Sequence, residues 1–92
     1  MYLHLGNETV VILKDIIGIF DLDTSTISQS SRRFLADAQK GGRVVNVSDE
    51  LPKTYIVCSD CESRQTVYIS QISSATLRKR VAFLNGHSND LL

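Results

Sequence analysis

The segment RVVNVSDELPKTYIV, residues 43–57, consists of two short apolar runs joined by a polar loop. Both runs are rich in β-branched and aromatic residues, which favour β-strands. The loop SDELPK, residues 48–53, is called the acidic loop below and contains Asp49, Glu50, Lys53 and the only proline of the chain, Pro52. The segment predicts a strand, a charged loop and a second strand, and it raises the question of what the loop contacts.

Before this segment, three apolar runs predict three strands. The first two, MYLHL and TVVIL, are separated by Gly6-Asn7 and predict a hairpin, and the third, IIGIFDL, follows a turn at Lys14-Asp15. Gly18 interrupts the third run, where glycine usually marks a bulge or a close approach of backbone. This part of the chain is therefore predicted to be all β.

From Thr24 onward the apolar residues follow the period of a helix. They share one face of a helical wheel and are Ile27, Phe34, Leu35 and Ala38. Ser and Thr residues between Thr24 and Ser31 offer N-caps, and Gly41-Gly42 offers a left-handed C-terminal stop. We predict one helix with one buried face.

After the opening segment, TYIVC and QTVYIS predict a second hairpin around the turn SDCESR. A second helix is expected from Ser73 or Ser74 to about Leu84, with a buried face that includes Leu77. Phe83 lies about 120° from that face, so it either contacts another subunit or lies along the edge of its own core.

These elements predict a small α+β domain over residues 1–85, in the order βββ-α-βββ-α, with residues 86–92 as a frayed tail. A domain of this size buries only about two-thirds of the surface that its unfolded chain exposes. We therefore expect a homo-oligomer, assembled in part through strand edges and the Phe83 side of the last helix.

The net charge is zero, because 10 Lys and Arg balance 10 Asp and Glu. The protein as a whole is therefore not attracted electrostatically to DNA or to an anionic membrane. The charges are unevenly placed, since residues 32–43 hold Arg32, Arg33 and two further basic residues against one acid. No apolar stretch approaches the roughly 20 residues of a membrane span, and a secretory signal is absent. We expect a cytoplasmic protein without membrane contact.

Cys58 and Cys61 form the most conspicuous chemical motif. The spacing is compatible with reduced structural thiols in a hairpin turn, with a reversible disulfide, or with half of a zinc site that lacks its other ligands. We expect both cysteines to be dispensable for folding, and no metal or cofactor to be bound.

Asp49 and Glu50 do not suggest an acid/base pair, because consecutive residues of an extended segment point to opposite sides. No phosphate-binding glycine loop, nucleophile elbow or HExxH helix occurs in the sequence. We do not expect an enzyme.

Four stretches, MYLHLG, KDIIGIFDLDTSTIS, VVNVSDELPKTYIV and VYISQISSATLRKR, resemble the RemA/RemB family of extracellular matrix regulatory proteins. The resemblance covers about residues 1–81. It implies a LytTR-like fold, ring-shaped oligomers, and a sequence-tolerant DNA binder that activates biofilm matrix genes. It also implies that double-stranded DNA, other copies of the chain and a RemA-like relative are its partners.

In RemA-like members the loop that corresponds to SDELPK is arginine-rich and contributes to DNA contact. Here Lys53 is its only basic residue, with Asp49 and Glu50 in place of arginines. A further DNA-contacting arginine of the family corresponds to either Lys14 or Asp15.

Two functions follow from these observations. The first is a DNA-associated transcriptional regulator that works as an oligomer through weak phosphate contacts from Lys14, Lys53, Arg32 and Arg33. The second is an interaction module that does not bind DNA, whose acidic loop, with Asp49, Glu50 and Pro52, meets a basic protein partner.

Overall fold

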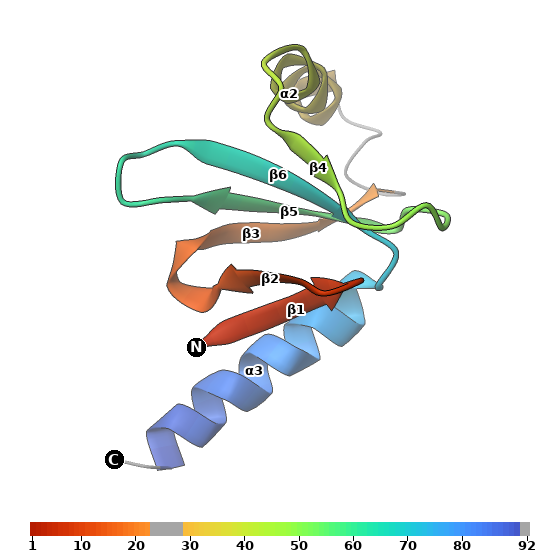
Figure 1. Cartoon of the computed structure of the whole chain (residues 1–92). Coiled ribbons are helices and arrows are strands. Elements are labelled where there is room, and N and C mark those ends of the chain that lie inside the picture. The colour runs from red at the N-terminus through yellow and green to blue at the C-terminus, as the bar shows by residue number, and fades with distance from the viewer. Residues whose placement is uncertain (23–28, 91–92) are drawn as a thin grey trace.

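The structure, a computed structural model, describes residues 1–22 and 29–90, except for the side chains of residues 86–90. The elements are β1 (Tyr2–Gly6), β2 (Thr9–Ile12), the single 3₁₀ turn η1 (Leu13–Asp15), β3 (Ile16–Asp21), α2 (Gln29–Lys40), β4 (Val44–Asn46), β5 (Thr54–Ser59), β6 (Gln65–Ser70) and α3 (Ser74–Asp90) (Figure 1). The α+β class and the predicted order of strands and helices are confirmed.

The strands form two sheets. β1 and β2 make an antiparallel hairpin of their own, and a four-stranded sheet has the order β3-β5-β6-β4. β5 runs antiparallel to both of its neighbours, whereas the short β4 pairs in parallel with β6. Both predicted hairpins are confirmed, and β3 and β4 are the edges of the larger sheet.

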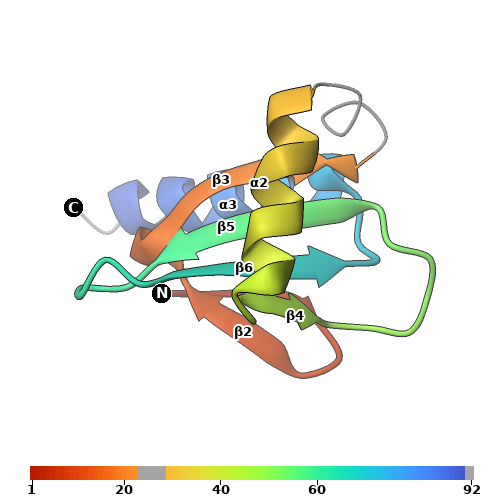
Figure 2. The same cartoon turned by 90° about the horizontal axis from the view of Figure 1, so that it is seen from above.

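Three layers result from the way in which β5 alternates its side chains. Tyr55 and Val57 pack with α2 on one face of the sheet. Ile56 and Cys58 pack on the other face, with the β1–β2 hairpin and α3. Figures 1 and 2 show α2 crossing above the sheet, with the hairpin and α3 below it. β5 is therefore the centre of the fold, covered on both faces.

α2 ends at the predicted glycine stop. Gly42 has φ +70°, and its N–H donates to the carbonyl of Gln39 while the N–H of Arg43 donates to that of Ala38. This pair of bonds satisfies carbonyls that the helix end leaves open. Some of the N-cap residues predicted between Thr24 and Ser31, and Ile27 on the predicted buried face, lie outside the described residues.

α3 begins where the sequence predicts but continues further. The Ser73 hydroxyl accepts a hydrogen bond from the backbone N–H of Thr76, as an N-cap does, and Leu77 is fully buried. The predicted end near Leu84 is wrong, because α3 continues through Gly86 to Asp90. A glycine inside a helix costs only about 1 kcal/mol relative to alanine, which does not by itself end a helix. Within the described residues, no helix has the length and apolar character that a membrane span requires.

Gly18 lies at a break in the register of β3 with β5, so the predicted bulge is confirmed. A Cβ atom at this position would stand 2.5 Å from Cζ of Phe20. The glycine therefore leaves room for the Phe20 ring, which stacks on Tyr55 at a centroid distance of 5.0 Å.

Candidate nucleic-acid and partner interface

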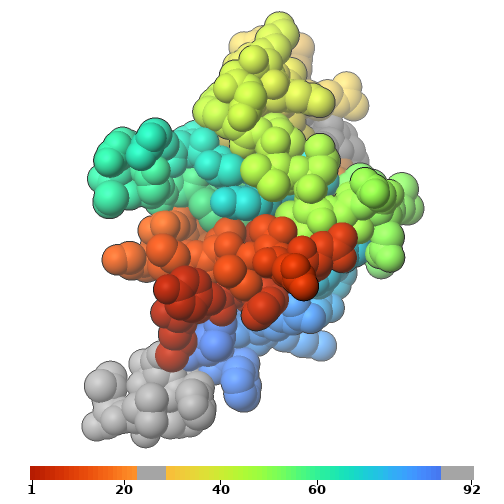
Figure 3. All heavy atoms as spheres, viewed as in Figure 1, coloured from red at the N-terminus to blue at the C-terminus, as the bar shows by residue number. Residues whose placement is uncertain are grey.

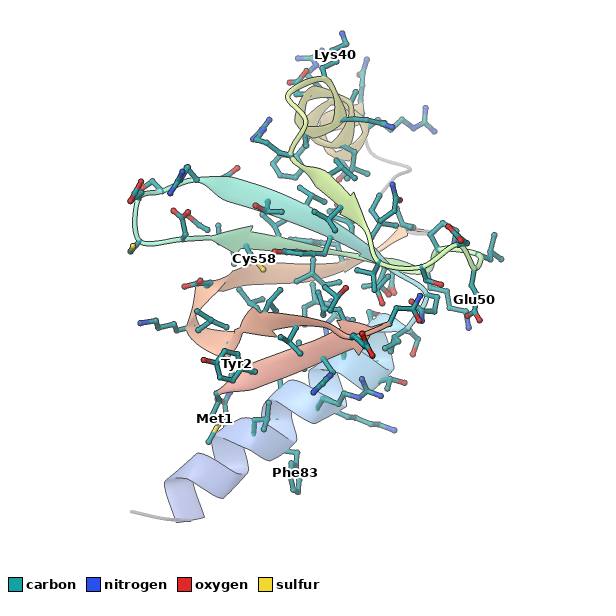
Figure 4. The ribbon with its side chains drawn as sticks, in the orientation of Figure 1. Met1, Tyr2, Lys40, Glu50, Cys58 and Phe83 are labelled. Atoms are coloured by element: carbon teal, nitrogen blue, oxygen red, sulfur yellow. The ribbon has the colours of Figure 1, made fainter. Side chains whose placement is uncertain are left out.

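The acidic loop connects β4 to β5 and presents an exposed tip. Asp49, Glu50, Pro52 and Lys53 are all exposed, and Leu51 is 80% exposed, the highest value among the large apolar residues of the described chain. The Ser48 hydroxyl accepts the backbone N–H of Glu50 at 3.0 Å, which turns the chain outward at the two acids. Figure 4 shows Glu50 at the outer end of this loop.

The base of the acidic loop, in contrast, is held firmly. The backbone N–H of Lys53 donates to the Ser70 carbonyl at 2.9 Å, and the Lys53 carbonyl accepts the N–H of Leu22 at 3.0 Å. Next to it, the buried Thr54 hydroxyl donates to the Ile72 carbonyl at 2.6 Å. These bonds fix the direction in which the tip leaves the sheet.

Lys14 and Lys53, the two lysines predicted to contact DNA, lie far apart in one protomer. Lys14 is exposed on η1, just before Ile16, which pairs with Cys58. Lys53 precedes Thr54, at the other end of β5. A six-residue strand spans about 20 Å, so the length of the sheet separates the two lysines.

Arg32 and Arg33 are exposed on α2, in the layer above the sheet. The structure therefore does not join the four predicted basic residues into one surface of a single protomer. The sequence did not reveal this separation, because their relative positions depend on which strands pair.

A second charged connection, residues 60–64, joins β5 to β6 and is called the ion-paired turn below. The Asp60 carboxylate accepts the backbone N–H groups of Glu62 at 2.8 Å and Arg64 at 2.9 Å. The Arg64 guanidinium also pairs with Asp60 at 3.2 Å and with Glu62 at 3.0 Å. The backbone N–H of Arg64, then that of Glu62 and the Arg64 charge, hold the pKa of Asp60 below its usual value. The charged side chains of this turn are therefore paired with one another and with the backbone of the turn itself.

Cys58 and Cys61 occupy different environments and are both free. Cys58 belongs to β5, as the run TYIVC predicts, and is 7% exposed in the core. Burial, with a smaller contribution from the Asp15 charge, raises the pKa of the Cys58 thiol to about 11. Cys61 is exposed in the ion-paired turn. No group of three or more His, Cys, Asp or Glu residues that could hold a metal ion occurs in the described part of the chain.

An apolar groove runs between β1 and the outer side of α3, and we call it the aromatic groove. Its volume is about 570 Å³, and its lining includes Tyr2, His4, Lys79, Arg80, Phe83 and Leu84. Phe83 is 69% exposed and Tyr2 63% exposed, and Figure 4 shows both rings on the outer surface. Phe83 is thus exposed in a single protomer, and its role in a subunit contact stays a prediction.

Three consecutive basic residues of α3, Arg78, Lys79 and Arg80, differ in their contacts. Arg78 donates to the Ile19 carbonyl of the edge strand β3 at 2.6 Å, and Arg80 donates to the His4 carbonyl of β1 at 3.2 Å. Lys79 lies between them, exposed at the aromatic groove. Arg78 therefore covers part of the β3 edge, which makes that edge less open to pairing than the sequence suggested.

Comparison with known proteins gives one consistent result. Residues 2–81 match a family described as extracellular matrix regulatory protein A-like, or RemA-like. The chain is also similar to extracellular matrix regulatory protein B of Bacillus subtilis (strain 168), with 37% identity over 84 residues, which cover 91% of this chain and 94% of that protein. The resemblance seen in the four sequence stretches is confirmed.

Proposed function

Because the chain belongs to the RemA-like family of extracellular matrix regulatory proteins, we propose that it regulates matrix genes as a DNA-associated homo-oligomer. The observation that carries this proposal is the extent of the match, which runs from β1 into α3. It includes Lys14, Lys53, Arg32 and Arg33, all four of which are exposed.

The proposed contacts are with phosphates. Lysine and arginine neutralise backbone charge and release counterions whatever the base sequence. One protomer offers these groups at separate places, so its own affinity for DNA is low. An oligomer repeats each group around its surface, and the repetition raises the effective concentration of every further contact. Binding is then indifferent to sequence and steeply dependent on salt.

The experiment measures fluorescence anisotropy of two unrelated DNA duplexes over a series of salt concentrations, with oligomer of measured mass. Lys14→Ala and Lys53→Ala should each weaken binding to both duplexes by the same factor and flatten the salt dependence. Lys14→Arg and Lys53→Arg are the matched controls, since they keep the charge and should keep the affinity. An intact oligomer that binds neither duplex at low salt removes DNA from the proposal.

A second candidate function is favoured by the tip of the acidic loop. Leu51 stands 80% exposed beside Glu50, on a base fixed by hydrogen bonds. Acids repel phosphates, whereas an exposed leucine directly preceded by two acids suits an apolar protein site with a basic rim. The loop then serves as a protein contact, and any DNA contact falls to residues outside its acidic tip.

A further inference from the structure

We propose that the tip of the acidic loop of one protomer, residues 49–51, docks into the aromatic groove of a second copy of the chain. This inference rests on the homo-oligomer of the proposed function and names its contact. It does not depend on whether the oligomer binds DNA.

The apolar parts of the two surfaces correspond. Leu51 offers an exposed aliphatic side chain at the end of a narrow loop. The aromatic groove offers Tyr2 and Phe83, both mostly exposed, and its lining also includes Leu84. An aliphatic anchor inserted beside aromatic rings is the usual centre of a protein interface, and it removes all three exposed apolar side chains from water.

The charges around these apolar parts are opposite. Asp49 and Glu50 directly precede Leu51 in the loop, and Lys79 and Arg80 line the groove. The ion pairs that join described residues to one another involve Arg64 with Asp60 and Glu62, and none uses these four side chains. Arg80 donates one N–H to the His4 carbonyl, and its guanidinium has further N–H groups that can bind a carboxylate. Opposite charges at the rim favour encounter and fix orientation.

The arrangement of the two surfaces requires a second copy. Figure 4 shows Glu50 at one side of the molecule and Tyr2 and Phe83 on the hairpin and α3 below the sheet, away from that loop. Figure 3 shows the acidic loop projecting from the body of the protein. Each contact joins two different surfaces, so it can be made twice in a reciprocal dimer or repeat head-to-tail to close a ring or extend a filament. The fixed base of the loop keeps the ordering cost of docking low.

Exchange of the charges tests this contact. We would measure mass by light scattering for the wild type, for Asp49→Lys with Glu50→Lys, and for Lys79→Glu with Arg80→Glu. Each variant alone places like charges across the contact, so each should fall to a smaller species at a concentration where the wild type is assembled. An equal mixture should regain the wild-type mass. The basic loop of the first variant can pair with the acidic groove of the second, and the acidic loop of the second can pair with the basic groove of the first.

The matched control is Asp37→Lys, a charge reversal at an exposed position of α2, which should leave the mass unchanged. Circular dichroism verifies that each variant is folded. If a charge variant does not fold, Leu51→Ala and Phe83→Ala replace it, and each should shift the assembly midpoint to a several-fold higher concentration.

Three results would overturn the contact. They are a monomeric wild type at tens of micromolar, a folded charge variant that keeps the wild-type mass, and a mixture that stays dissociated. Loss of DNA binding by an oligomer of unchanged mass would count against the DNA part of the proposed function and leave this contact standing.

Discussion

The two ends of β5 carry charged connections of similar length and opposite character. At one end, the ion-paired turn satisfies Asp60 with two backbone N–H groups and with Arg64. At the other end, the acidic loop holds Asp49 and Glu50 exposed beside Leu51, with its hydrogen bonds concentrated at the base. The charges of the ion-paired turn are thus paired within the turn, whereas the carboxylates of the acidic loop are exposed to solvent.

The difference separates two uses of surface charge. A carboxylate that accepts backbone N–H groups stabilises the turn that contains it. A carboxylate without such partners contributes little to folding, and its field acts on whatever approaches. The strand between them joins both ends to the core, since Thr54 and Cys58 are buried at the two bases. Substitutions at the base and at the tip of each connection should therefore act on different properties.

The largest effect on stability is expected at the base of the ion-paired turn. The sequence leads us to expect both cysteines to be dispensable, but Cys58 is buried. Cys58→Ser therefore places a hydroxyl in an apolar part of the core and should lower the free energy of unfolding by about 1–3 kcal/mol. Cys61→Ser changes an exposed position and should stay within about 0.5 kcal/mol of the wild type. Urea denaturation measures both. Equal stabilities for the two variants would show that the burial of Cys58 has no energetic weight.

A smaller effect should distinguish the tips of the two connections. Asp60→Ala deprives two backbone N–H groups of their acceptor, so it should lower the melting temperature, though by less than Cys58→Ser. Asp49→Ala removes no hydrogen bond of this kind and should leave the melting temperature unchanged when both proteins are compared at a concentration where they are dissociated. Thermal unfolding followed by circular dichroism compares them. If Asp49→Ala is the more destabilising, the acidic loop is part of the folding framework and the comparison fails.

The smallest effect should appear on acidification. The pKa of Asp60 is lower in the folded protein than its usual 3.8, so the unfolded chain binds the proton first as the pH falls. The stability that the Asp60 charge supplies is present above that value and is lost as the pH falls through the folded pKa. Asp60→Asn keeps an oxygen for the N–H groups and removes the charge. Its stability difference from the wild type should shrink below about pH 4, and a constant difference would contradict this assignment.

The sequence predicts the helices and strands of this fold better than it predicts which of them lie side by side. The apolar runs and helical faces identify six strands and two helices because these signals are local. The parallel pairing of β4 with β6 depends on packing between distant segments, which no local pattern encodes. The burial of Cys58 did have a signal, since the unbroken apolar run from Tyr55 to Cys58 is typical of a strand covered on both faces.

For the candidate site, the sequence indicates which residues are charged or exposed but not where they gather. The helical period of the sequence indicates that Phe83 lies off the buried face of its helix. Its neighbour Tyr2 comes from the first strand and is brought there only by the packing of α3 on β1. The separation of Lys14 from Lys53 likewise follows from strand order. Such distances are properties of the topology.

The hairpin of β1 and β2 has a consequence for the order in which the protein is made. Its inner face, with Leu3, Leu5 and Val11, is buried against Ile56 and Leu77, and the Leu5 carbonyl accepts the Ser70 hydroxyl from 65 residues further along the chain. A ribosome therefore releases this apolar face long before the segments that cover it exist. The nascent chain must keep the hairpin soluble, or held by a chaperone, until α3 has left the exit tunnel. Closure of the domain is then a late and cooperative event, limited by contacts between residues far apart in sequence.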